Sequence, residues 1–222
     1  MELTAVAAWL NQTFAAADAA VAQFAFSLHN GALGGFFDWL FPSVTVLGDG
    51  GVFFIIVGVL LLLFARTRKG GASILIGLLF GLLITNLALK TSIARPRPYA
   101  DEMSMFYEFW QTIGHGLESE FSFPSGHSTA SFAACTAFFW AGNRRYSWCA
   151  FILSAMVAFS RIYIHVHYFS DVIAGTIVGF VSGTLAYLLI KWIFDKLQKT
   201  EHPVPRFLTN ASLSNLFKKK QV

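Results

Sequence analysis

Three short polar fragments interrupt an otherwise apolar sequence, at residues 90–98, 124–127 and 160–171. Together they contain cationic side chains, a Ser-Gly pair, histidines and a carboxylate. Such a set can bind a phosphate through its cations and displace a group from phosphorus with an imidazole. A Lys, Arg or Asp at the centre of a membrane helix costs about 2.5–3.5 kcal/mol on insertion scales, so charge there usually marks function. The fragments are therefore the candidate site.

The third fragment places His167 and Asp171 four residues apart, on one face of a helix. The carboxylate can hold one imidazole nitrogen protonated and leave the other free to attack. The planar guanidinium of Arg161 suits two phosphate oxygens at once. A buried ion pair between helices is the alternative for Arg161 and Asp171. His165 has no matching carboxylate and is expected to be structural or peripheral.

The second fragment directly precedes an apolar run. Pro124 and Ser125 suit the start of a helix, and Gly126 permits close approach of the backbone. The free N–H groups and the positive end of the helix dipole form a seat for an anion. His127 would lie beside that anion and donate a proton. Taken alone, the stretch could equally be a helix cap with a solvent-facing histidine.

In the first fragment, Lys90 ends an apolar span, and Pro96 and Pro98 prevent the helix from continuing. Lys90 and Arg97 can therefore converge from a helix end and an extended loop. Arg95 also precedes a proline, so spacing alone does not choose between the two arginines. Taken alone, the fragment could be a charged anchor beside a membrane.

The elements that must position these residues are membrane helices. The chain has 222 residues, of which 55% are hydrophobic and 13% charged, and its mean hydropathy is +0.58. About 17–25 apolar residues span a bilayer. The candidate spans are residues 45–65, 72–90, 126–142, 147–164 and 172–193. Glycines at four-residue spacing in the second and fifth of them predict close helix packing.

The basic residues predict which side holds the site. Twelve of the sixteen Lys and Arg residues lie at 66–69, 144–145 and 191–220, which the five spans place on one face. The positive-inside rule makes that face cytoplasmic. The other four belong to the polar fragments and lie at the opposite face: Lys90, Arg95, Arg97 and Arg161. The site is therefore expected to be extracytoplasmic.

The two ends of the chain are expected to lie outside the bundle. Residues 4–28 have no basic flank, which favours amphipathic helices on the outer interface over a sixth span. Residues 196–222 are expected to form a basic cytoplasmic tail behind one membrane domain, residues 1–195. Cys135 and Cys149 lie in apolar stretches without metal-ligand spacing and are expected to be buried thiols.

The ordered fragments Lys-x6-Arg-Pro, Pro-Ser-Gly-His and Ser-Arg-x5-His-x3-Asp resemble the three signature motifs of the type 2 phosphatidic acid phosphatase and vanadium haloperoxidase superfamily. The resemblance covers residues 90–171 and every signature position. It implies an all-α, polytopic membrane bundle with phosphatase activity, no cofactor and no metal. Its partners would be a lipid phosphate and membrane lipids, with no nucleic acid.

The resemblance also assigns roles to individual residues. His167 would be the nucleophile that forms a phosphohistidine, Asp171 its orienting partner and His127 the general acid. The resemblance selects Arg97 over Arg95 for the phosphate. The phosphate-binding residues would be Lys90, Arg97, Ser125, Gly126 and Arg161.

The substrate is less closely defined. Residues 99–122 are rich in aromatic and acidic side chains and are expected to form an interfacial lid. A site at the membrane surface favours a phosphate on a lipid, such as undecaprenyl diphosphate, phosphatidylglycerol phosphate or phosphatidate. Undecaprenyl diphosphate is the first choice because its recycling suits an outward-facing site. A phosphotransferase using the same residues, or an anion or lipid transporter, are the alternatives.

Overall fold

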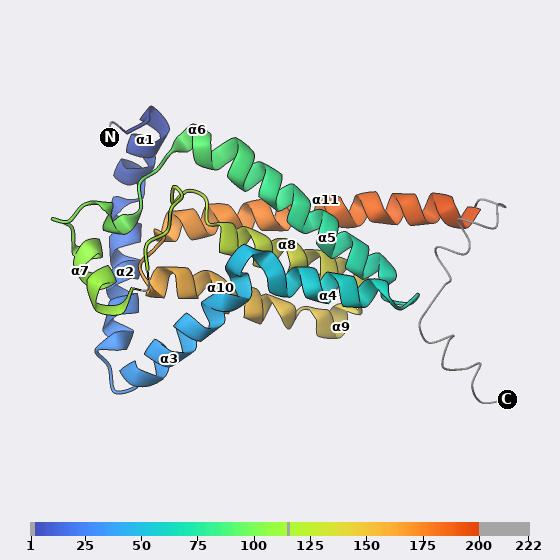
Figure 1. The fold of residues 1–222 in the computed structure, drawn as a ribbon, viewed down its shortest axis with the longest axis horizontal. Coiled ribbons are helices and arrows are strands. Elements are labelled where there is room, and N and C mark those ends of the chain that lie inside the picture. The colour runs from blue at the N-terminus through green and yellow to red at the C-terminus, as the bar shows by residue number, and fades with distance from the viewer. Residues whose placement is uncertain (1–2, 115, 200–222) are drawn as a thin grey trace.

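A computed structural model describes residues 3–114 and 116–199, and these residues form an all-α fold (Figure 1). Thr4, Ser104 and Ser125 cap the helices that follow them through their side-chain oxygens. The elements in chain order are α1 (Ala5–Thr13), α2 (Ala15–His29), α3 (Gly34–Thr45), the 3₁₀ segment η1 (Val46–Gly51), α4 (Val52–Leu62), α5 (Arg68–Leu82), the π-helical segment η2 (Leu83–Lys90), α6 (Thr91–Ile93), the 3₁₀ segment η3 (Pro98–Ala100), α7 (Met105–Ile113), α8 (Gly126–Ala141), α9 (Arg144–Ser147), α10 (Ala150–Tyr163) and α11 (Phe169–Lys199).

The centre of the bundle is α8, which packs against α5, α10 and α11. The glycines of α11 permit this contact. A Cβ atom on Gly175 would lie 2.5 Å from the Ser125 carbonyl oxygen, and one on Gly183 would lie 2.4 Å from the Ala133 carbonyl oxygen. The close helix packing predicted from the glycine spacing is confirmed. It matters for function because it holds the start of α8 against the start of α11.

Among the residues that the structure describes, four helical segments are long and apolar enough to cross a membrane, by length and composition: Gly34–Leu62, Arg68–Ala100, Arg144–Tyr163 and Phe169–Lys199. The 16 residues of α8 make a shorter helix, about 24 Å long at 1.5 Å per residue. The expected span at 45–65 is divided by left-handed Gly50 and Gly51, so α4 has only 11 residues. The chain is a polytopic membrane bundle, and five spans remain a prediction.

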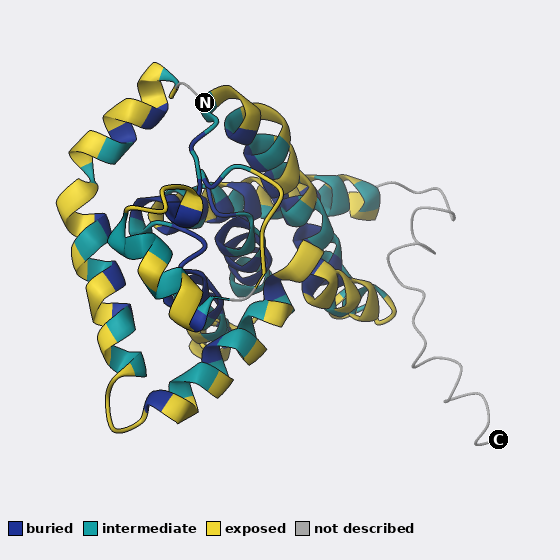
Figure 2. Cartoon of the chain, turned by 60° about the vertical axis from the view of Figure 1, so that its left-hand side comes forward, coloured by how far each residue is buried: buried dark blue, intermediate teal, exposed yellow. Residues whose placement is uncertain are grey.

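The N-terminal helices α1 and α2 run across one end of the bundle rather than along it (Figure 1). Neither is among the candidate spans found in the described residues. Figure 2 shows buried residues gathered inside the bundle and exposed residues on its outer faces. The exposed residues include large apolar side chains such as Ile55, Leu82 and Leu188. This distribution suits a surface that meets lipid.

Figure 1 shows that the elements carrying the two predicted groups of basic residues lie toward opposite ends of the bundle. The α4–α5 connection, α9 and the end of α11 lie toward one end, whereas α2, α6 and α7 lie toward the other. A tail was predicted for residues 196–222, and its part beyond residue 199 lies outside the described residues. Cys135 is buried as expected, but the prediction for Cys149 is wrong because this residue is exposed at the start of α10.

Candidate active site

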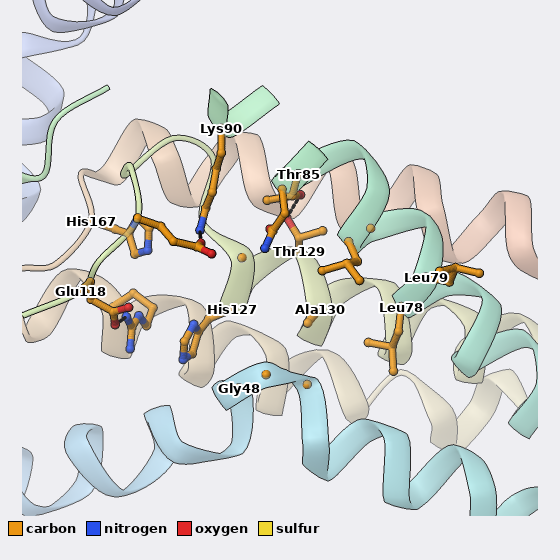
Figure 3. Close-up of a pocket in the computed structure, with 18 of the residues that line it drawn as sticks. Gly48, Leu78, Leu79, Thr85, Lys90, Glu118, His127, Thr129, Ala130 and His167 are labelled. Carbon is orange, nitrogen blue, oxygen red and sulfur yellow. Dashed lines mark hydrogen bonds and ion pairs between the residues drawn. The ribbon is translucent and has the colours of Figure 1, made fainter. Parts of the chain in front are cut away.

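The three polar fragments meet at one cavity of about 620 Å³. Figure 3 shows Lys90, His127 and His167 reaching it from η2, from the start of α8 and from the α10–α11 connection. Six of the eight residues proposed from the sequence line it. These six are Lys90, Arg97, Gly126, His127, Arg161 and His167. Ser125 and Asp171 are fully buried behind the lining.

The imidazole of His167 has a defined tautomer. Its Nε2 lies 3.0 Å from Nη1 of Arg97. A guanidinium can only donate, so Nε2 accepts this hydrogen bond and carries no proton. The proton is therefore on Nδ1, which lies 3.5 Å from Oδ2 of Asp171. Burial, followed by the positive charge of Arg97, lowers the pKa of His167 well below its ordinary value. The ring is neutral at pH 7, and its lone pair faces Arg97.

Asp171 is fixed through both carboxylate oxygens. Oδ1 accepts a hydrogen bond from Nη1 of Arg95 at 2.6 Å, and Oδ2 accepts one from the Tyr168 N–H at 2.9 Å. The remaining direction of Oδ2 is toward His167. The separation of 3.5 Å is longer than a good hydrogen bond, and such contacts often tighten only when substrate binds. Asp171 can therefore orient the imidazole.

Two carboxylates from the loop that follows α7 pair with the cations in front of His167, on the side of the cavity. Glu120 pairs with Lys90, and Glu118 pairs with Arg161. Glu118 also lies 3.8 Å from Nη2 of Arg97. Within the described chain, the buried Nε of Arg161 has no hydrogen-bond partner. The cavity thus gathers three cations and holds two anionic side chains beside them.

The start of α8 forms the floor of the site. Ser125 caps the helix, and its Oγ accepts from the Ser128 N–H and contacts the Ser128 hydroxyl. Its own N–H donates to the Asp171 carbonyl oxygen at 3.0 Å. A Cβ atom on Gly126 would meet no atom within 4 Å. The open space expected at the helix N-terminus is therefore over Gly126, whereas the side chain of Ser125 is engaged within the helix turn.

His127 has a partner that the sequence did not identify. Its Nε2 lies 2.7 Å from Oδ1 of Asp49, which belongs to η1. The ring packs closely on Gly48, where an added Cβ would lie 2.4 Å from the His127 Cδ2 atom. An acidic residue within a Gly-Asp-Gly-Gly stretch was the only signal, and spacing could not connect it to a residue 78 positions away. Asp49 and Gly48 fix the ring at the edge of the cavity.

His165 and Arg95 do not line the cavity. His165 is 1% exposed, has φ of 55° and packs against Phe26 and Phe109. Burial lowers its pKa to about 4, so the ring is neutral at pH 7. Arg95 turns away from the cavity and binds Asp18 and Asp171. Spacing left open which arginine faces the site, whereas the motif resemblance selected Arg97, and Arg97 is the one that lines the cavity.

The far end of the cavity is apolar. Figure 3 shows Leu78 and Leu79 of α5 beyond the charged residues. Ile55 of α4, with Leu75 and Leu82 of α5, also lines this part. A ligand with a charged head and an apolar tail would fit such a cavity, because the two ends of the site differ in polarity.

The fold and the site define a helical membrane protein with a histidine and three cations at the polar end of a cavity. A model of the PAP2 superfamily matches residues 70–195, which contain all the predicted site residues. The chain therefore belongs to the PAP2 superfamily, as the motifs predicted.

Similar proteins include lipid phosphatases. The chain is 29% identical to phosphatidylglycerophosphatase B of Bacillus subtilis, over 72% of this chain and 70% of that protein. It is 31% identical to an undecaprenyl-diphosphatase of Sulfolobus acidocaldarius, over 55% of this chain and 56% of that protein. A PA-phosphatase related-family protein of Dictyostelium discoideum is 30% identical over 56% of this chain, which spans 49% of that relative. The chain thus spans about half the length of some relatives.

Two crystal structures share the fold. A PAP2-type phosphatidylglycerolphosphate phosphatase from Bacillus subtilis superposes with a TM-score of 0.62 at 22% identity, over 88% of this chain and 94% of that chain. Aquifex aeolicus LpxE superposes with a TM-score of 0.59 at 23% identity, over 72% of this chain and 91% of that chain.

Proposed function

We propose that this chain is a membrane lipid phosphatase that hydrolyses a phosphomonoester or diphosphate through a phosphohistidine on His167. The observation that supports this most directly is the unprotonated Nε2 of His167, which lies 3.0 Å from the cation of Arg97. A neutral imidazole nitrogen beside fixed positive charge can attack phosphorus while the charge stabilises the phosphate oxygens.

The first step forms a bond between His167 Nε2 and phosphorus as the bond to the lipid oxygen breaks. Lys90, Arg97 and Arg161 bind the phosphoryl oxygens, together with the N-terminus of α8 at Gly126. Asp171 stabilises the positive charge that develops on the imidazole. Protonated His127 gives its proton to the departing oxygen. Such proton transfer contributes about 10²–10⁴-fold to the rate.

The second step releases phosphate. The now neutral His127 takes a proton from water, and the resulting nucleophile attacks the phosphohistidine. The bond between phosphorus and Nε2 breaks, which returns His167 to its neutral state. Asp49, 2.7 Å from Nε2 of His127, stabilises the protonated ring in the first step. We propose that both steps proceed without a metal ion, because three cationic side chains supply the positive charge.

The apolar end of the cavity supports a lipid substrate, with its phosphate at the cations and its chain between α4 and α5. Undecaprenyl diphosphate, phosphatidylglycerol phosphate and phosphatidate all carry the required head and tail. We propose undecaprenyl diphosphate first, because the charge distribution of the chain favours an extracytoplasmic site in the cell membrane.

Phosphate release by the purified full-length chain from a panel of these three lipids tests the proposal. We expect release in excess chelator and inhibition by vanadate, a mimic of the transferred phosphoryl group. Lipid or anion transport without release would indicate a transporter, and transfer to an acceptor other than water would indicate a phosphotransferase. Loss of turnover in chelator, restored by a divalent ion, would contradict metal independence.

Single cysteines test the orientation in a background without Cys135 and Cys149. An impermeant thiol reagent applied to intact cells should label a cysteine at residue 102, an exposed position between η3 and α7. It should not label a cysteine at residue 68, at the opposite end of the bundle. The reverse pattern would place the site on the cytoplasmic side.

A further inference from the structure

Arg95 is the centre of a buried ionic cluster behind the proposed nucleophile. Its side chain is 1% exposed. Nη1 donates to Oδ1 of Asp171 at 2.6 Å and to Oγ of Ser170 at 2.7 Å, whereas Nη2 donates to Oδ2 of Asp18 at 2.9 Å. Nε donates to Oδ1 of Asn11 at 2.8 Å. Every nitrogen of the guanidinium is therefore engaged, and none is left for a phosphate.

The second carboxylate of the cluster comes from the N-terminal region. Asp18 lies on α2 and is 2% exposed. Besides Arg95, it accepts hydrogen bonds from the backbone N–H of Ser170 at 2.8 Å and from the Ser170 hydroxyl at 2.9 Å. Ser170 immediately precedes Asp171 in the first turn of α11. Asp18 therefore holds both the cation that binds Asp171 and the backbone that carries it.

The geometry of Asp171 shows why this support matters. A buried guanidinium without a second anion would be free to tilt, and a buried carboxylate without a cation would take up a proton. Arg95, held between two carboxylates, donates a hydrogen bond to Oδ1 of Asp171 and stabilises the negative charge of that carboxylate. Oδ2 is then the oxygen that faces Nδ1 of His167, at 3.5 Å. The direction of the His167 lone pair depends on this arrangement.

We propose that Asp18 and Arg95 are positioning residues for His167, acting through Asp171. This inference rests on the proposed role of His167 as nucleophile. It gives the crossing helices α1 and α2 a role in the reaction, although residues 11 and 18 lie outside the part of the chain that matches the family model. Asp18 and Arg95 would affect the rate of phosphoryl transfer rather than the binding of phosphate.

Asp18→Asn in the full-length chain tests the proposal, because it keeps the shape of the side chain and removes its charge. We expect kcat to fall by about 10–100-fold, as for other partners that orient a reacting group. KM and the affinity for vanadate should change by less than about 3-fold, because the cations in front of His167 remain. The matched control is Asp38→Asn on α3, whose carboxylate binds Tyr163 and His29 away from the cavity. It should keep kcat within about 3-fold.

A double-mutant cycle separates positioning from general loss of structure. In an Asp171→Asn background, Asp18→Asn should lower kcat by less than about 2-fold, because its route to His167 is already removed. An equal loss in both backgrounds would overturn the proposal. Unchanged kcat in the single variant would also overturn the proposal, as would a loss of kcat matched by weaker vanadate binding.

Asn11→Ala is the second variant if Asp18→Asn does not fold. It removes one neutral hydrogen bond to Arg95, so it should give a smaller loss of kcat, again without weaker vanadate binding. Unchanged kcat in Asn11→Ala would overturn the proposal.

A readout without turnover distinguishes this inference from the proposed function. Nitrogen NMR of the chain labelled at histidine should show the proton of His167 on Nδ1, and Asp18→Asn should shift it toward a mixture of tautomers. The same tautomer in both chains would overturn the positioning role, even if the wild type is an active phosphatase. Absence of phosphatase activity in the wild type, with the tautomer shift observed, would overturn the proposed function and leave the positioning role standing.

Discussion

Charged groups lie on two sides of His167. Those behind it, on the side away from the cavity, differ in kind from those in front of it, which line the cavity. Behind it, Arg95 is enclosed by Asp18 and Asp171, and the side chains of all three are at most 2% exposed. In front of it, the cations pair with Glu118 and Glu120, whose side chains are 37% and 54% exposed. The rear cluster joins α2 to the start of α11, whereas the front carboxylates belong to a loop.

This difference separates two tasks that the same types of side chain perform. A buried ion pair with complete hydrogen bonding is expensive to break, so it suits a part that must not move. An exposed carboxylate binds its cation weakly because water competes for both. The front anions can therefore exchange for a phosphate, and the rear anions cannot. Four variants test the comparison.

Loss of His167, which lies between the two regions, should have the largest effect on turnover. His167→Ala should lower turnover by roughly 10⁴–10⁶-fold, because the attacking nitrogen is gone. It should also abolish any acid-labile phosphoenzyme, measured by trapping with labelled substrate. His165→Asn is the matched control, since asparagine tolerates the positive φ of that position. A phosphoenzyme that survived in His167→Ala and vanished in the control would show that the nucleophile is misassigned.

The second largest effect on turnover should come from Asp171, in the buried cluster behind His167. Asp171→Asn should lower kcat by roughly 10²–10⁴-fold, because the imidazole loses the carboxylate that orients it and stabilises its charge. Vanadate should still bind with nearly wild-type affinity, measured by inhibition or by calorimetry. Vanadate binding that fell in parallel with kcat would contradict the division between the two regions.

A cation in front should affect binding as well as rate. Arg161→Ala should lower kcat by roughly 10²–10³-fold, as removal of one donor to a developing charge does. Unlike the rear variant, it should also weaken vanadate binding, because the guanidinium contacts the anion itself. The measurement is a vanadate titration of Arg161→Ala beside one of Asp171→Asn. Equal vanadate affinities in the two variants would count against the assignment of Arg161 as an anion-binding residue.

Removal of a front anion should have the smallest effect and the opposite sign. Burial raises the pKa of Glu118, but the charge and hydrogen bond of Arg161 outweigh it, so the pKa lies below its ordinary value. Glu118 is therefore ionised at pH 7 and competes with phosphate. Glu118→Gln should tighten vanadate binding by about 3–10-fold, in line with a partly exposed ion pair. The gain should shrink as the pH falls through the lowered pKa. The control is exposed Glu102, which precedes α7 and does not line the cavity. Weaker binding in Glu118→Gln would refute the competition.

Short-range spacing predicted a large part of this site. The four-residue interval between His167 and Asp171, the helix start at Ser125 and the helix stop before Pro96 each depend on atoms within one or two turns. The two helix boundaries appear in the structure as expected. The expectation that His167 and Asp171 share a helix face is wrong, because His167 lies in the α10–α11 connection, before α11 begins at Phe169. The two side chains still meet, with Nδ1 of His167 3.5 Å from Oδ2 of Asp171. The exposed position of Cys149 was not predicted, because an apolar stretch can face lipid as well as the protein interior.

The sequence by itself therefore determined the helical membrane class, the distribution of basic residues and the residues that reach one cavity, since composition and helical periodicity are local properties. The motif resemblance selected Arg97 over Arg95, but only the tertiary structure decided that Arg95 faces Asp18, 77 positions away, and that Asp49 pairs with His127. These contacts join separate elements, because α2 packs against α11 and η1 packs against α8. The spacing of residues along the chain does not determine how these elements are placed, because the placement depends on which helix faces pack together.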